Sequence, residues 1–259
     1  MAPYSVLVTG ANRGIGLALV KEFLKNKGVG IVIATTRNPE KAKDLYGISD
    51  GRLRIVRLDL NDDDSIEEAV SEIQAILGDK GLNVLVNNGA VLLPSETKQK
   101  ITRETLISQF QPNVFGTVIL SQALLPLLEK ASSLHQNEDL SINRAAILNI
   151  SSGAGSIGQS TFDCPYGGSR LFRLFSYRAS KASLNMVTRT MAIDLVNESI
   201  LVCCFCPGPV DTEMHPDKEH KDSLLKPEES ASVLVNSFFK LNSSHNGNFY
   251  DRNLESIPF

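Results

Sequence analysis

Thr-Gly-Ala-Asn-Arg-Gly-Ile-Gly at residues 9–16 decides the fold, because it joins a short apolar run to an amphipathic run through a glycine-rich turn. In a turn between strand and helix, Gly10 permits a tight bend, Gly14 lets a pyrophosphate approach the backbone, and Gly16 lets the helix pack on the sheet. The helix N-terminus then offers free N–H groups and a partial positive charge to phosphates. A plain loop is the alternative for a glycine triplet alone, but this strand-turn-helix context favours nucleotide binding. The predicted cofactor-binding residues of the turn are Gly10, Asn12, Arg13, Gly14, Ile15 and Gly16.

The rest of the chain alternates between short apolar runs and longer amphipathic runs. The runs that predict strands are Tyr4–Thr9, Gly30–Thr35, Leu53–Leu58, Leu82–Val86, Ala145–Ile150, Ile200–Cys206 and a short tail at Asn248–Asp251. The runs that predict helices are Ile15–Lys27, Asp63–Leu77, Thr105–Lys130, Tyr177–Val196 and Pro227–Leu241. Strands that alternate with helices favour right-handed βαβ units and a parallel sheet. We therefore predict an α/β, single-domain Rossmann-type fold over residues 1–259, a doubly wound parallel sheet with helices on both faces.

The composition is that of an ordinary globular protein, with 42% hydrophobic and 21% charged residues among 259. A net charge of −3 argues against nucleic acid as a partner, because phosphate binding relies on a basic surface. No apolar run has the length of a membrane span and no targeting stretch opens the chain, so we expect a cytoplasmic protein without a membrane partner. The cysteines, Cys164, Cys203, Cys204 and Cys206, match no zinc spacing, so we expect no metal site.

The end of the second predicted strand, Ala34-Thr35-Thr36-Arg37, indicates which dinucleotide binds. A protein that binds NAD usually places an acidic residue here to hold the ribose 2′-hydroxyl, whereas an arginine suits a 2′-phosphate. No Asp or Glu lies between Ile31 and Asn38. Arg37, assisted by Arg13, is therefore predicted to favour NADP(H), and two solvated surface arginines are the alternative.

Tyr177 and Lys181 lie four positions apart at the start of a predicted helix, so both side chains are expected on one face. A tyrosine pKa of ~10 must fall by about two or three units to exchange protons near neutrality, and one cation at ~4 Å supplies ~4 kcal/mol at an effective dielectric near 20. The pair is therefore sufficient in principle to make Tyr177 a proton donor. Taken alone, such a pair is more often a surface contact, but the equivalent position four residues after Tyr166 is Arg170, which cannot act as an adjustable proton carrier.

With these motifs in order, the chain resembles the short-chain dehydrogenase/reductase family, and within it the sniffer-type carbonyl reductases and the related C-factor group. The resemblance covers nearly the whole chain and rests on Thr9–Gly16, Asp59-Leu60, Asn87-Asn88, Asn113, Ser151-Ser152, Tyr177-x-x-x-Lys181 and Pro207-Gly208-x-x-x-Thr212. It implies that Ser152 hydrogen-bonds the substrate oxygen, that Tyr177 protonates it, and that Lys181 lowers the Tyr177 pKa and holds the nicotinamide ribose. It also implies that Asn113 anchors a water linked to Lys181. The further cofactor contacts that it implies are Asp59 and Leu60 at the adenine, Asn88 at the adenosine ribose, and Val210 and Thr212 at the carboxamide. Gly208 is also an implied cofactor-binding residue.

The chain departs from the family's pattern at three places. Ser152 and Tyr177 are separated by 25 positions, more than in the family's shorter form, and we interpret the loop Gly153–Ser176 as an insertion near the pocket. The family's usual Asn-Asn-Ala-Gly appears here as Asn87-Asn88-Gly89-Ala90, which moves the glycine by one place. Pro112 precedes Asn113 inside a predicted helix, where it should disturb the local hydrogen bonds.

The sequence therefore predicts an NADP(H)-dependent reductase of aldehydes or ketones with Asn113, Ser152, Tyr177 and Lys181 as the catalytic set. A non-catalytic NADP(H)-sensing protein and an enzyme that oxidises alcohols, such as hydroxysteroids, are the alternatives. The resemblance also implies a homodimer formed through the helices that begin near Thr105 and Tyr177. The sequence does not name the physiological substrate.

Overall fold

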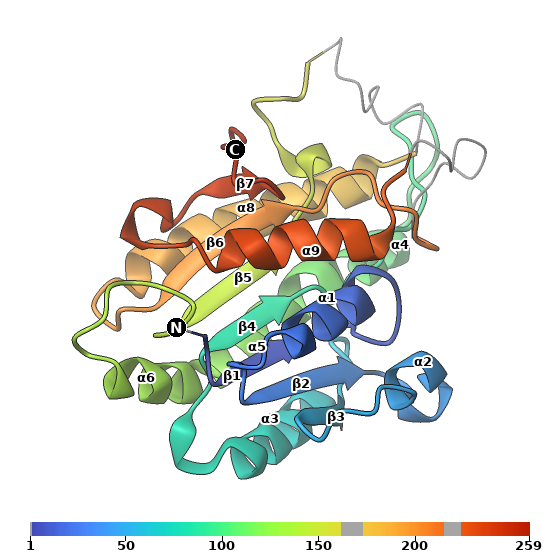
Figure 1. Cartoon of the computed structure of the whole chain (residues 1–259). Coiled ribbons are helices and arrows are strands. Elements are labelled where there is room, and N and C mark those ends of the chain that lie inside the picture. Colours follow the sequence, from blue (N-terminus) through green and yellow to red (C-terminus); the bar gives the residue numbers. More distant parts are fainter. Residues whose placement is uncertain (1, 162–172, 215–223) are drawn as a thin grey trace.

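The computed structural model describes residues 2–161, 173–214 and 224–259 of the chain. Within these ranges seven strands form one sheet in the order β3-β2-β1-β4-β5-β6-β7, and every neighbouring pair is parallel (Figure 1). The strands are β1 (Ser5–Val8), β2 (Ile31–Thr36), β3 (Leu53–Arg57), β4 (Val84–Asn87), β5 (Ala146–Ile150), β6 (Leu201–Cys206) and β7 (Phe249–Asp251). The order reverses between β1 and β4, and in doubly wound sheets such a switch point is where ligands bind. The predicted fold class is confirmed.

Helices cover both faces of this sheet, because the central strands are apolar on consecutive positions. On one face Val6 and Val8 of β1 pack with α1 (Gly14–Lys25) and α9 (Pro227–Phe238), which lie together in Figure 1. On the other face Leu7 packs in a second core with α3 (Asp63–Leu77) and the C-terminal end of α8 (Phe175–Asp194). The remaining helices of the described chain are the short α2 (Lys43–Tyr46) and the α4 to α6 series.

The predicted helix Thr105–Lys130 is broken in three. It consists of α4 (Arg103–Phe110), α5 (Gly116–Ala123) and α6 (Leu125–Leu134), with a π-helical turn over Gln111–Phe115 between the first two. Pro112 occupies this turn, and a proline supplies no N–H to the helical ladder. The predicted disturbance at Pro112 is confirmed, whereas the single long helix was wrong.

Among the described residues, no helix by itself combines the length and apolar composition needed to cross a membrane. One pair, Arg103–Ala123 with Leu125–Leu134, meets that test only when the two are taken together across a 50° bend.

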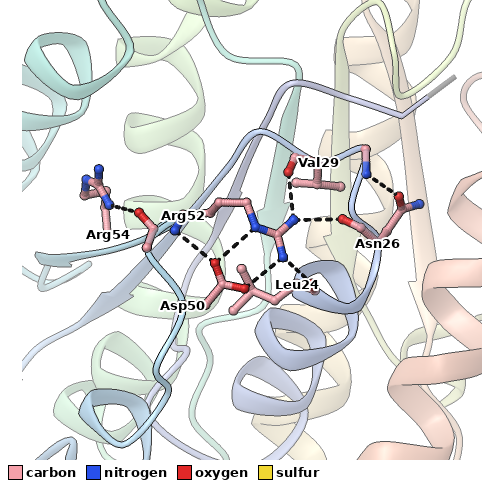
Figure 2. Close-up of polar contacts among 8 residues, drawn as sticks. Leu24, Asn26, Val29, Asp50, Arg52 and Arg54 are labelled. Atoms are coloured by element: carbon pink, nitrogen blue, oxygen red, sulfur yellow. Dashed lines mark hydrogen bonds and ion pairs between the residues drawn. The ribbon is translucent and has the colours of Figure 1, made fainter.

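Arg52 joins several segments by hydrogen bonds at the end of the sheet where β2 and β3 begin (Figure 2). Its guanidinium donates to both carboxylate oxygens of Asp50, at 3.0 and 2.8 Å. It also donates to the backbone carbonyls of Asn26 and Val29, each at 2.9 Å, and to that of Leu24. All five N–H donors of the side chain are thereby used. The hydrogen bonds from Arg52 lower the pKa of Asp50 from 3.8 to about 2.

Candidate active site

A pocket of about 380 Å³ opens at the other end of the sheet, beside the carboxyl ends of β1, β2 and β4. Most of the predicted site residues line it, which are Gly10, Asn12, Arg13, Gly14, Ile15, Gly16, Arg37, Asp59, Leu60, Asn88, Tyr177, Lys181 and Thr212. Asn113, Ser152, Gly208 and Val210 do not belong to this lining. The structure therefore brings the glycine turn, the Arg37 position and the Tyr177–Lys181 pair to one cavity.

The glycine turn leaves no room for a side chain at Gly16 or at Gly10. A Cβ on Gly16 would lie 2.3 Å from the Gly10 carbonyl oxygen and 2.6 Å from Nδ2 of Asn88. Gly10 and Gly14 have φ angles of +62° and +54°, which glycine adopts without strain. The Asn88 amide donates to the carbonyls of Thr9 at 2.9 Å and Gly10 at 3.2 Å. Asn88 therefore fixes the shape of the turn from the neighbouring strand, in addition to lining the pocket.

The shifted glycine of the Asn87-Asn88-Gly89-Ala90 segment lies directly against this turn. A Cβ on Gly10 would come within 2.8 Å of the Gly89 Cα. The Thr9 hydroxyl oxygen accepts the backbone N–H groups of Asn88 and Gly89, each at 2.9 Å. Sequence reasoning gave Thr9 no role of its own, although its place at the carboxyl end of β1 was the available signal. The two loops are thus joined by hydrogen bonds between the side chain of each and the backbone of the other, beside the pocket.

The two arginines predicted to bind a 2′-phosphate differ in their surroundings. Arg37 is exposed at the end of β2, lines the pocket, and has no ion pair with any residue that the structure describes. Arg13 is ion-paired with Glu213, which lies beyond β6. Thr212 lies over the same turn, since a Cβ on Gly14 would be 3.2 Å from its Cγ2. Arg37 is therefore the better placed of the two for an added phosphate.

Lys181 is buried beneath Tyr177, on the helix face that the four-residue spacing predicts. Its Nζ lies 5.8 Å from the centroid of the Tyr177 ring and donates to the Ile150 carbonyl at 2.7 Å. Only 3% of the lysine is exposed. Burial lowers the pKa of Lys181 from 10.5 to about 8, while the nearby Cys204 and Cys206 thiols act in the opposite direction. The ammonium therefore titrates close to the physiological range.

The pKa of the half-buried Tyr177 is shifted upward. Burial raises it well above its ordinary value, and a hydrogen bond with Ser152 lowers it by less. The predicted fall in the Tyr177 pKa is therefore wrong for this structure, because desolvation of the phenol is the largest cause of its shift. At neutral pH the Tyr177 phenol is protonated.

Ser152 follows β5 and caps the short helical turn Gly153–Gly155. Its Oγ accepts the backbone N–H of Ala154 at 3.2 Å, which leaves the hydroxyl proton to be donated elsewhere. The preceding Ser151 is buried and donates to Oδ1 of Asn185 at 2.5 Å, so its hydroxyl proton is held by α8.

Asn113 is buried in the π-helical turn and holds the two segments that flank it. Its Oδ1 accepts the N–H of Val91 at 2.8 Å, and its Nδ2 donates to the Val91 carbonyl and to Oγ of Ser180, both at 3.0 Å. Its side chain therefore links the loop after β4 to α8, and the implied water contact remains a prediction.

Gly208 and Val210 belong to the segment after β6, outside the pocket lining. Gly208 has a φ of +83°, and Val210 is buried and forms a bridge with Leu225. Asp211 lines the pocket and was not predicted. It occupies an unspecified position of the motif Pro207-Gly208-x-x-x-Thr212, so the motif gave no signal for it. Of the predicted insertion Gly153–Ser176, residues 162–172, and with them Cys164, lie outside the described ranges.

Residues 4–223 match the short chain dehydrogenase family. Among solved structures, a Caenorhabditis elegans chain described as a candidate carbonyl reductase Sniffer is 41% identical, with a TM-score of 0.89 and 100% of both chains covered. Carbonyl reductase Sniffer of D. melanogaster is 32% identical, with a TM-score of 0.90 over 99% of this chain and 100% of that chain. An NADPH-bound carbonyl reductase from chicken fatty liver is 33% identical, with a TM-score of 0.90 over 100% of both chains. The similarity to these structures thus extends over the whole chain.

Proposed function

The chain belongs to the short chain dehydrogenase family, and on that premise we propose that it reduces aldehyde or ketone carbonyls to alcohols with NADPH. The observation that carries the proposal is the Tyr177 phenol above the buried Lys181 ammonium, which lies 5.8 Å from the centroid of the phenol ring, in the pocket that the glycine turn lines. The similar carbonyl reductases support the reaction type.

The residues of the pocket fit NADP(H). The turn excludes a Cβ at Gly16 and begins α1, so its backbone suits a pyrophosphate at a helix N-terminus. Arg37 supplies a cation where the 2′-phosphate is expected, beside Thr36 at the end of β2. When bound, the reduced nicotinamide supplies the hydride, and the protein supplies orientation and protons.

The side chains divide the remaining chemistry between them. Ser152 and Tyr177 present two hydroxyl donors to the carbonyl oxygen, where negative charge develops as the carbon is reduced. An alkoxide is far more basic than a phenolate, so a phenol with a raised pKa still gives up its proton to it. The buried Lys181 ammonium stabilises the phenolate that results, because it lies on the same helix face.

Turnover by the purified protein with NADPH and a panel of reactive dicarbonyls, quinones and simple aldehydes tests the proposal. Tyr177→Phe removes the transferred proton, and general acid catalysis is worth about 10²–10⁴-fold, so kcat should fall by that factor while NADPH binding is kept. Tyr46→Phe changes an exposed tyrosine remote from the pocket and should match the wild type. Binding of NADPH without turnover on any member of the panel would instead identify a sensor.

We also propose a homodimer in the cytoplasm. Ile107 of α4, Phe115 of the π-helical turn, and Met186 and Ile193 of α8 are large apolar side chains that are 45–66% exposed on helices that pack together. Light scattering should give twice the chain mass, and Met186→Glu should shift it to the monomer mass. A monomer mass for the wild type would contradict the homodimer. Fluorescence of a tagged chain outside the cytoplasm would contradict the cytoplasmic location.

A further inference from the structure

The segment Ile257–Phe259 runs back along β7 and is fixed to it. Tyr250 and Ser256 form an antiparallel bridge, and the N–H of Ile257 donates to the Phe249 carbonyl at 2.8 Å. The rings of Phe249 and Phe259 stack with centroids 6.0 Å apart. The segment is therefore held in place by the edge strand of the sheet.

The same segment makes close contact with the loop that follows β5. The Ser156 hydroxyl donates to the Pro258 carbonyl at 2.5 Å, and the Gly158 N–H donates to the Phe259 carbonyl at 2.8 Å. A Cβ on Gly158 would lie 2.9 Å from the Cβ of Pro258. The Ser156 oxygen also accepts the N–H of Gln159 at 3.0 Å, and Ser156 is 2% exposed. Two residues of the loop are thus joined to two residues of the segment at contact distance.

This loop begins with Ser152. Its first part is anchored to the sheet, since the Gly153 N–H donates to the Cys206 sulfur at 3.1 Å. Its middle is anchored to α8, since Asn185 donates to the Gly155 carbonyl at 3.2 Å. Ser156 comes directly after the short turn that Ser152 caps, so its hydrogen bond to Pro258 anchors the C-terminal end of that turn.

We propose that Ile257–Phe259 is a positioning element for Ser152, acting through Ser156 and Gly158 on the turn that carries the serine. The inference rests on the proposed function, in which Ser152 hydrogen-bonds the substrate oxygen. A displacement of a catalytic group by about 1 Å reduces turnover by up to about 10²-fold, because the hydrogen bond to the developing oxyanion requires alignment. Residues 257–259 do not belong to the lining of the pocket that the glycine turn and Arg37 form, so we expect cofactor binding to be independent of the segment.

Gly158→Ala tests the proposal, because the added methyl group displaces Pro258 without a positive φ at residue 158. The matched control is Gly51→Ala, at an exposed position where a Cβ meets nothing within 4 Å. We expect faster amide exchange over residues 153–160 and a kcat lower by about tenfold, with the NADPH dissociation constant within about twofold of the wild type. The control should change none of the three.

Ser156→Ala is the second variant, and Ser156→Thr, which keeps the hydroxyl, should restore part of the kcat that the alanine loses. Faster exchange in Gly158→Ala and Ser156→Ala with unchanged kcat would overturn the proposal and leave the contact as packing only. Unchanged exchange in both would overturn it as well. If the wild type and Gly51→Ala both lack carbonyl turnover, the proposed function fails first and this inference fails with it.

Discussion

The two ends of the sheet satisfy their polar groups to different degrees. At the end where β2 and β3 begin, Arg52 uses all five of its donors on Asp50 and on backbone carbonyls. At the opposite end, Lys181 is buried with its pKa lowered to about 8, and the pKa of Tyr177 is raised. The Thr35 hydroxyl at the wall of the pocket is buried without a hydrogen-bond partner among the described residues.

This difference separates the group that stabilises the fold from the groups available for chemistry. A charge that is paired and fully hydrogen-bonded stabilises the native state and has little further capacity to bind a ligand. A buried lysine bonded to one carbonyl, like Lys181, reduces stability through desolvation but has donors left for a ligand. Substitutions at the two ends should therefore affect different measurements, and each prediction below tests that separation.

The largest effect is expected at Lys181. Lys181→Ala removes the cation beneath Tyr177, so kcat should fall by about 10²-fold or more, the lower range of general acid catalysis. The melting temperature should be unchanged or higher, because the desolvated ammonium is gone. Steady-state kinetics and thermal unfolding of the same preparation check both. If the melting temperature fell together with kcat, Lys181 would contribute to stability as well as to turnover. The proposed difference between the two ends of the sheet would then be wrong.

The next effect is expected at Arg37, and it concerns cofactor choice. A charged hydrogen bond to the 2′-phosphate is worth about 1.5–3 kcal/mol, so Arg37→Asp should reduce the preference for NADPH over NADH by at least about tenfold. Arg54→Asp makes the same charge change at the Arg52 end, on an exposed side chain bonded to the Gly51 and Leu53 carbonyls. The ratio of kcat/KM for the two cofactors should move only in the first variant. An unchanged ratio in Arg37→Asp would refute the phosphate assignment.

The sequence predicted the parts of the molecule that depend on local pattern. The apolar strands, the turn at Gly10 and the shared helix face of Tyr177 and Lys181 all follow from residue spacing, and the structure has them within about two residues. The break at Pro112 was also foreseen as a disturbance, although not as a π-helical turn that divides one predicted helix into separate pieces.

The parts that the sequence did not predict depend on contacts between distant segments. The Lys181 ammonium is directed to the Ile150 carbonyl 31 positions away, and burial raises the Tyr177 pKa, which residue spacing alone predicted to fall. The Arg52 cluster joins residues 24–29 to residue 52, and no motif marks it. The pairing of Arg13 with Glu213 joins segments 200 positions apart.

A smaller effect, on stability alone, is expected at Arg52. Arg52→Met keeps the length of the side chain but leaves the carbonyls of Leu24, Asn26 and Val29 without their donor. Three carbonyl hydrogen bonds at about 1 kcal/mol each correspond to a fall in melting temperature of roughly 6–12 °C for a chain of this size. Arg54→Met, beside it in Figure 2, should change the melting temperature by less. In both variants kcat should stay within about twofold of the wild type, and a large loss of kcat in Arg52→Met would break the separation of the two ends.

The smallest effects are expected from pH, and stability should rise with pH at both ends of the sheet, in an acid interval at one end and an alkaline interval at the other. The native pKa of Asp50 is about 2, below its ordinary 3.8, so the contribution of Asp50 to stability is complete above about pH 4 and is lost as the pH falls toward 2. The native pKa of Lys181 is about 8 against 10.5, so between pH 8 and 10 the unfolded chain holds more protons there and stability rises with pH. Over that same interval kcat should fall, because Lys181 loses the charge that supports Tyr177.

Denaturant unfolding across both intervals checks the signs, with Asp50→Asn expected to remove the acid dependence and Lys181→Met the alkaline one. If the stability of Lys181→Met still rose between pH 8 and 10, another group would be responsible for that rise. The lowered pKa of Lys181 would then not account for the alkaline dependence of stability.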